Sequence, residues 1–293
     1  MHYFCSIRLN LNFICRYETF NCYSFKNNLD GLKRTYCYIA KQTLRRSFEW
    51  IVIDSASIDG TPEFLKTHQN EIDNYISEPD TGIYNGMNKG VRLASAEYIL
   101  FLNAGDTLLD NKVIENVLPY LTDTSIISGA MQCNGVVTSP VDISNNSFAI
   151  FFKDSICHPA TFIKKELLIN HPYDESLKIV SDWKFWIETI IFENETYKPI
   201  PVVVSVFENG GISSTNLSLL HAERDKVMKE LIPARILADY KLIFNHADGN
   251  LYWYIMKSRH REKIYALLVK LFKLIGILYK IPPHIMKLPN TFQ

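Results

Sequence analysis

Four aspartates stand at positions from which a side chain can reach a ligand. Asp54 ends the apolar run "FEWIVID", Asp80 ends "NYISEPD", and Asp106 ends "EYILFLNAGD". Asp182 stands directly before the apolar run "WKFWIETII". Carboxylates gathered in one place suit two kinds of chemistry, because they bind a hard divalent cation beside phosphate groups and they remove a proton from a hydroxyl group.

The segments around the first three aspartates alternate between strand and helix. Short apolar runs rich in β-branched residues predict strands over residues 48–54, 74–80 and 97–106. The segments between and after them predict helices, over residues 29–46, 59–69, 82–96 and 111–121. Thr61 is the expected N-cap of the second helix, with Pro62 at its first position.

This alternation predicts an α/β fold with a mainly parallel, Rossmann-like sheet flanked by helices. In such sheets ligands bind outside the carboxyl ends of the strands. One aspartate at a strand end is commonly an ordinary turn residue. Asp54, Asp80 and Asp106 are expected on the same rim, and together they favour a binding site there.

After residue 125 the alternation stops. The segment 125–139 predicts a hairpin with Cys133, Asn134 and Gly135 at its turn. From about residue 216 the chain is predicted to be mostly helical. We therefore expect one α/β domain over residues 1–215 and a helical extension over residues 216–293.

The totals exclude several classes of protein. A formal net charge of zero does not indicate a nucleic-acid partner. The six cysteines form no CxxC pair, which favours a reduced, cytoplasmic protein. We find no convincing signal peptide and no run of about 20 apolar residues. The dinucleotide-binding GxGxxG, Walker A and GxSxG motifs are also missing from the sequence. The acidic rim instead favours Mn²⁺ or Mg²⁺ and a phosphate-bearing ligand.

Five ordered blocks resemble the family 2 glycosyltransferases, which are inverting enzymes with a GT-A fold, and most closely the branch that builds bacterial surface polysaccharides. The blocks are "FEWIVIDSASIDGTPEFL", "ISEPDTGIYNGMNKGVRLASAEYILFLNAGD", "HPATFIKKELL", "YDESLKIVSDWKFW" and "FENGGIS". They cover roughly residues 25–215. The resemblance implies a nucleotide-sugar donor, usually a UDP-sugar, a divalent metal ion, and a saccharide or lipid-linked saccharide acceptor.

The resemblance also implies roles for individual residues. Asp54 and Asp80 would hold the nucleoside, and Ser55, where the family usually has Gly or Asp, can still donate a hydrogen bond. Lys89 would lie near phosphate. Asp106 would meet the metal ion and the diphosphate, because "NAGD" stands where the family has its DxD-type segment.

Asp182, in "SDW", stands where the family places its general base. It could also cap the helix that follows it, and the two roles are compatible. Asn103, His158 and Trp183 are candidate contacts to the donor sugar or the acceptor. A structural role for His158 and a core position for Trp183 are the ordinary alternatives.

The first strand departs from the family pattern. The segment "TFNCYSFKNN" supplies the expected turn, but Asn21 and Ser24 interrupt the apolar strand that should form one wall of the nucleotide pocket. Two alternatives to an active enzyme therefore stay open. One is an inactive relative that still binds nucleotide, and the other is a membrane-associated scaffold that keeps the fold.

The carboxyl-terminal tail is basic. From Lys257 onward it holds eight Lys or Arg against the single acid Glu262, so about +7. The lysines at 263, 270, 273 and 280 fall within an arc of roughly 100° on a helix whose other surface is apolar. Such a helix suits an anionic membrane surface, here the inner face of the cell membrane. Packing on the α/β domain or on a second subunit explains the pattern nearly as well, and the oligomeric state stays open.

Overall fold

The computed structural model describes residues 19–103, 105–143, 148–152, 154–207, 215–245 and 261–278. The chain divides into two compact units, Met1–Val227 and Met228–Gln293. The first unit holds a nine-stranded sheet in the order β3-β2-β1-β4-β8-β6-β9-β5, with β7 paired to β6.

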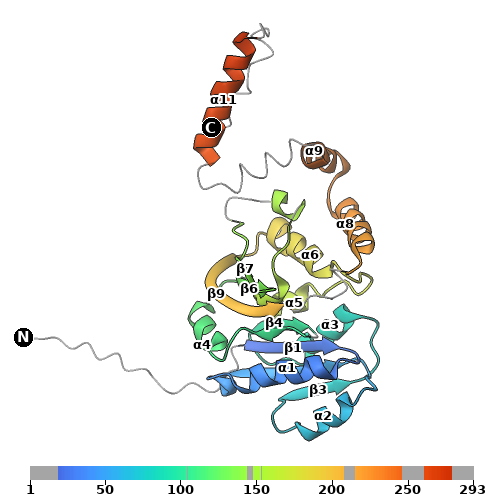
Figure 1. Ribbon diagram of the computed structural model, residues 1–293. Helices are drawn as coiled ribbons and strands as arrows, with labels where there is room; N and C mark the ends of the chain where they lie inside the picture. The colour runs from blue at the N-terminus through green and yellow to red at the C-terminus, as the bar shows by residue number, and fades with distance from the viewer. Residues whose placement is uncertain are drawn as a thin grey trace, which may run out of the picture. The chain divides into compact units, whose positions relative to one another are not determined.

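The first four strands in that order form a parallel half-sheet. They are β3 (Asn74–Ser77), β2 (Phe48–Asp54), β1 (Thr19–Phe25) and β4 (Tyr98–Asn103). The strand predicted over residues 48–54 is confirmed. The strands predicted over residues 74–80 and 97–106 are present but end earlier, at Ser77 and Asn103, so Asp80 and Asp106 lie in the loops that follow them. Figure 1 shows β1 between β3 and β4, with α1 lying along it.

The first strand is regular, although Asn21 and Ser24 were expected to interrupt it. All seven residues of β1 pair with β2, and Thr19 to Ser24 pair with β4 on the other side. Two parallel ladders satisfy the backbone of a central strand whatever its side chains are, so tertiary pairing outweighs the weak strand propensity of Asn and Ser.

The rest of the sheet is mixed. The strand β8 (Thr161–Lys164) is antiparallel to β4 and to β6 (Ile126–Cys133). The long, curved strand β9 (Tyr197–Phe207) is parallel to β6 and antiparallel to β5 (Thr107–Leu108). The predicted hairpin is confirmed, because β6 turns into β7 (Val136–Thr138) through Asn134 and Gly135, both at positive φ.

Helices and short helical turns of the first unit connect these strands. They are α1 (Leu29–Ala40), η1 (Arg45–Ser47), α2 (Thr61–Thr67), α3 (Ile83–Leu93), α4 (Val113–Val117), η2 (Leu118–Tyr120), η3 (Phe148–Phe152), η4 (His158–Ala160), α5 (Lys165–Asn170), α6 (Ser181–Trp186) and the π-helix η5 (Ile187–Phe192). The helix α8 (Leu217–Leu231) follows the last strand, and its first eleven residues belong to the first unit. The helical period of α1 buries Leu32, Thr35 and Ile39. Leu32 and Ile39 join Trp50, Leu100 and other side chains from both halves of the sheet in one apolar core. Each such buried side chain contributes about 1.5–3 kcal/mol of transfer free energy.

Two helix starts differ from the prediction. The N-cap of α2 is Gly60, at φ 85°, because Thr61 is already helical and its hydroxyl donates to Asp59. The N-cap of α6 is Val180, which makes no side-chain capping bond, so Asp182 lies in the first helical turn and does not cap it. The cap prediction failed because residues outside each helix bind these side chains.

The second unit contains α9 (Ala234–Asn245) and α11 (Arg261–Leu278). Leu267, Leu271 and Leu274 are exposed on α11 at helical spacing, and Lys263 and Lys270 are exposed as well. The side chain of Lys273 and all of Lys280 lie outside the described part of the chain. Within that part, no helix has the length and apolar character needed to cross a membrane.

Candidate active site

The parallel half-sheet brings Asp54 and Asn103 to one rim. Asp54 pairs with Phe25 of β1 and with Ser77 of β3, and Asn103 pairs with Ser24 of β1. The carboxyl ends of β3, β2, β1 and β4 therefore lie side by side, as the sequence predicted. This register places Asp54 and Asn103 on the two strands that flank β1.

Asp54 is fully buried and organises the turn after β2. Its two oxygens each lie 3.2 Å from the backbone N of Ser57, and Ser77 donates to Oδ2 at 2.6 Å. Ser57 Oγ in turn accepts from the backbone N of Asn27 at 2.7 Å. Ser55 is also buried, at 6% exposed. Asp54 thus ties β2 to β3 and supports the turn that carries Ser55.

Asp80 and Lys89 both act on the loop between β3 and α3. Asp80 Oδ1 accepts from the backbone N of Gly82 at 3.1 Å, directly before α3 begins. Lys89 Nζ lies 2.8 Å from Glu78 Oε1 and donates to the carbonyl O of Pro79 at 3.0 Å. The loop that presents Asp80 is therefore held at both ends by side-chain contacts.

Asp106 is 2% exposed, and its Oδ2 accepts from the backbone N of Asn103 at 3.1 Å. Thr35 of α1 donates to the carbonyl O of Asp106 at 2.7 Å, which ties the backbone at Asp106 to α1. The side-chain Oδ1 of Asn103 is buried and has no hydrogen-bond partner in the described part of the chain. A carboxylate and an orphaned amide oxygen are hard donors, so this tip fits Mn²⁺ or Mg²⁺.

A cation at this tip would need further ligands from elsewhere. Among the described residues no group of three His, Cys, Asp or Glu side chains could hold a metal ion. A single protein carboxylate with phosphate oxygens from the bound ligand is a common arrangement for Mg²⁺. The donor set is therefore consistent with an ion that arrives with a diphosphate.

Asp182 is half-buried in the first turn of α6 and contacts Tyr84 of α3. The Tyr84 hydroxyl lies 2.8 Å from Asp182 Oδ1 and 2.6 Å from the carbonyl O of Ile179. Burial, and then the charge of Asp182, raise the pKa of Tyr84 well above its usual value. Tyr84 therefore stays protonated and acts as a hydrogen-bond donor at neutral pH.

His158 and Trp183 lie in the interior. The His158 ring stacks on Phe101 at 5.1 Å, and its Nε2 lies 3.0 Å from the Tyr173 hydroxyl. Burial lowers the pKa of His158, and the nearby charge of Asp182 only partly opposes this. Trp183 is 2% exposed, and its Nε1 donates to the carbonyl O of Phe151 at 3.2 Å. These contacts favour core roles, and a sugar contact by either residue stays a prediction.

Comparison with known proteins assigns the family. Residues 22–168 match the family description Glycosyl transferase family 2. The chain belongs to this family. It is 27% identical over 191 residues to a PGL/p-HBAD biosynthesis glycosyltransferase of Mycobacterium bovis, an alignment that covers 60% of this chain and 72% of that protein. This family 2 member is therefore a glycosyltransferase.

Solved structures show the same GT-A-like α/β fold. S. aureus TarS 1-349 in complex with UDP-GlcNAc superposes with a TM-score of 0.58 at 16% identity, over 84% of this chain and 77% of that chain. The mannosyltransferase PcManGT from Pyrobaculum calidifontis, in complex with GDP-Man and Mn²⁺, superposes with a TM-score of 0.52 at 17% identity, over 82% and 84% of the two chains. Identities this low establish the fold alone.

Three residues of this glycosyltransferase that hold the site were not singled out from the sequence. Tyr84 binds the Asp182 carboxylate, and Asn88 binds the backbone of the segment before α6. Glu223 of α8 accepts two backbone N–H groups of the same segment. Tyr84 and Asn88 fall inside the block "GIYNGMNKG", so their helical spacing was a usable signal. Glu223 gave no such signal, because its partners lie more than 40 residues away.

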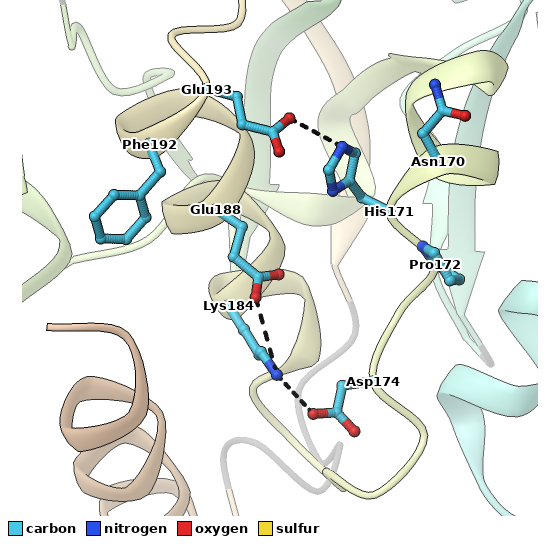
Figure 2. Close-up of a pocket in the computed structure, with 8 residues that line it drawn as sticks. All are labelled: Asn170, His171, Pro172, Asp174, Lys184, Glu188, Phe192 and Glu193. Carbon is cyan, nitrogen blue, oxygen red and sulfur yellow. Dashed lines mark hydrogen bonds and ion pairs between the residues drawn. The ribbon is translucent and has the colours of Figure 1, made fainter.

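A separate cavity of about 370 Å³ lies on another face of α6, where α5, its following loop and η5 meet. Figure 2 shows that its charged groups pair with one another: His171 with Glu193 at 2.9 Å, and Lys184 with Asp174 at 2.8 Å. Lys184 is two residues after Asp182, so the two side chains point roughly 200° apart around the helix. The cavity contains none of the predicted site residues.

Proposed function

We propose that this glycosyltransferase moves a sugar from a nucleotide-sugar donor, a UDP-sugar, to a hydroxyl group of a saccharide or lipid-linked saccharide, with inversion at the anomeric carbon. Asp182 is the general base. The observation that carries the proposal is the Asp182 carboxylate, held by Tyr84 at the start of α6. The donors present in the TarS and PcManGT complexes, UDP-GlcNAc and GDP-Man, support a nucleotide-sugar.

The reaction is one displacement. Asp182 accepts the proton of the acceptor hydroxyl, and the oxygen forms a bond to the anomeric carbon from the face opposite the leaving group. The bond from that carbon to the diphosphate breaks, and the nucleoside diphosphate leaves with the electron pair. A positioned carboxylate typically accelerates such a step by about 10²–10⁴-fold.

The remaining rim residues bind and orient the donor. Ser55 and Asp80 hold the nucleoside, Asp54 fixes the turn that carries Ser55, and Asn103 and Asp106 would hold the divalent cation. Such a cation supplies Lewis-acid stabilisation of the charge that develops on the leaving diphosphate. Lys89 meets phosphate only when its contact with Glu78 is exchanged for the ligand. The regular pairing of β1 supports an active enzyme, because this strand is the central support of the rim.

The test is turnover. The protein is incubated with Mn²⁺ and a panel of UDP-sugars, and UDP release is followed for the wild type and for Asp182→Asn. We expect the variant to lose about 10²–10⁴-fold in kcat. The control is Glu188→Gln, which changes a residue of η5 that lines the separate cavity described above. This variant should keep full activity. Undiminished turnover by Asp182→Asn would refute the assignment of the base. UDP binding without turnover by the wild type would favour an inactive relative, and no UDP binding would favour a scaffold.

We also propose that α11 contacts an anionic membrane surface. Leu267, Leu271 and Leu274 are exposed at helical spacing next to the exposed lysines 263 and 270. Apolar and cationic groups on one helix suit the boundary between acyl chains and anionic headgroups. Replacing the three leucines by Gln in the full chain should abolish flotation with phosphatidylglycerol vesicles. Unchanged flotation would refute the contact.

A further inference from the structure

The segment that leads into Asp182 needs support from outside. Residues 178–180 lie in no helix or strand, and the N-cap Val180 makes no side-chain hydrogen bond. The helix α6 continues directly as the π-helix η5, so its carboxyl-terminal end is supported by the helix itself. Its start has no side-chain cap, and such a start leaves the first N–H groups without intrahelical partners. The direction of the Asp182 carboxylate must therefore come from other elements.

Glu223 of α8 holds this segment from one side. Its Oε1 accepts from the backbone N of Lys178 at 2.8 Å, and its Oε2 accepts from the backbone N of Ile179 at 2.9 Å. Glu223 is 8% exposed, so water competes little for these bonds. A charged acceptor makes them stronger than ordinary amide hydrogen bonds. Two bonds to successive N–H groups fix both the position and the rotation of this stretch of backbone.

Tyr84 of α3 holds the same segment from a second helix. Its hydroxyl is within hydrogen-bond distance of both the Ile179 carbonyl O and Asp182 Oδ1. A phenol has one proton, so it donates to one of these oxygens at a time. An ionised carboxylate is the stronger acceptor. When Asp182 takes up the acceptor proton, the carbonyl is still in reach, so Tyr84 stays bound to the segment throughout the reaction.

We propose that Glu223 of α8 and Tyr84 of α3 form a clamp that positions the Asp182 carboxylate for proton abstraction. The inference rests on the proposed role of Asp182 as the base. Both are positioning residues, because they act through Asp182 and its segment. Lys178 Nζ also donates to the carbonyl O of Thr81 at 2.9 Å, which links the clamped segment to the loop of Asp80. Glu223 lies outside residues 22–168, the part of the chain that matches the family description. The helix α8 would therefore contribute a positioning residue from outside the matched region.

The test measures kcat and KM for Tyr84→Phe and Glu223→Gln, using the UDP-sugar that the wild type turns over fastest. We expect kcat to fall about 10–100-fold, because a shift of about 1 Å in a catalytic group costs that much. The donor KM should change less than about threefold, because on this proposal the clamp acts through Asp182 and not through donor binding.

Matched controls remove the same kinds of bond elsewhere. Tyr197→Phe loses a hydroxyl that donates to the carbonyl O of Val141 at 2.7 Å. Glu49→Gln changes a carboxylate that is also 8% exposed and accepts from the backbone N of Ser95 at 2.8 Å. Both controls should keep the wild-type kcat. If Glu223→Gln does not fold, Tyr84→Phe decides alone, because it preserves the packing of the ring.

The Asp182→Asn background separates positioning from a general structural role. There, Tyr84→Phe should lower kcat less than about twofold further, since the base it positions is already gone. An equal loss in both backgrounds, or a loss confined to the donor KM, would overturn the clamp and leave the role of Asp182 intact. Full activity of Asp182→Asn, or no turnover by the wild type, would overturn the proposed function and the clamp with it.

Discussion

Asn88 offers a strong test of how the site is supported. Its side chain is 4% exposed and acts like a backbone partner for Tyr173, donating to the Tyr173 carbonyl O at 2.8 Å and accepting from the Tyr173 N at 3.0 Å. It also donates to Glu175 Oε1 at 2.9 Å. Asn88→Ala removes all three bonds. Each buried backbone group that loses its partner costs about 1–3 kcal/mol, so we expect a loss of about 2–5 kcal/mol in the free energy of unfolding.

The assay is urea denaturation followed by tryptophan fluorescence, with a check that the slope m is unchanged. Asn85→Ala is the matched control, because Asn85 lies on the same helix and donates to the same Glu175 carboxylate at 2.7 Å, but no backbone group depends on it. Asn85→Ala should lower the free energy of unfolding by less than about 1 kcal/mol. A loss below about 1 kcal/mol for Asn88→Ala, or equal losses for the two variants, would refute the reasoning.

Three further predictions concern the rim, the sheet and the separate cavity beside α6. Asp106→Asn keeps an oxygen that can accept from the Asn103 N–H but removes the negative charge, so Mn²⁺-dependent UDP release should fall at least about 100-fold. The free energy of unfolding should stay within about 1 kcal/mol of the wild type. Retained turnover would contradict the metal role. Gly129→Ala would place a Cβ 2.6 Å from the carbonyl O of Val202, so we expect a loss of about 1–3 kcal/mol by thermal unfolding, and wild-type stability would contradict it. Burial alone would raise the pKa of Asp174, but hydrogen bonds from Lys184 and a neighbouring serine outweigh it and hold the pKa at about 2. This depressed pKa stabilises the folded state above about pH 4, and the stabilisation is lost as the pH falls toward 2. Asp174→Asn should therefore lower the free energy of unfolding by about 1–2 kcal/mol at pH 7 and by progressively less below pH 4. Urea titrations that show the same loss at every pH would contradict this role of the Asp174 carboxylate.

The parts of the fold that depend on neighbouring residues were readable from the sequence. The apolar run 48–54 and the Asn134–Gly135 turn each specify their own structure, and both were confirmed. Contacts between distant residues were not readable. The strand β1 is regular because β2 and β4, which come much later in the sequence, pair with it on both sides.

The same division applies to the candidate site. The alternation of strands and helices along the chain predicted that Asp54 and Asp106 lie at one rim, since the carboxyl ends of parallel strands share an edge. The sequence did not reveal that Asp54 is fully buried and supports a turn. Burial of this kind depends on Ser57 and Ser77, whose side chains look like ordinary loop residues in the sequence.

The pairing of β5 with β9 has a consequence for the order in which the protein is made. Asp106 directly precedes β5, and β5 pairs with β9 nearly 100 residues later. A chain leaving the ribosome, at about 5–20 residues per second, can complete the parallel half-sheet well before β9 emerges. The strand partner that anchors the acidic tip thus arrives only near the end of the α/β unit. A nascent chain stopped before residue 197 should therefore already contain the parallel half-sheet, yet lack the strand that pairs with β5 next to Asp106.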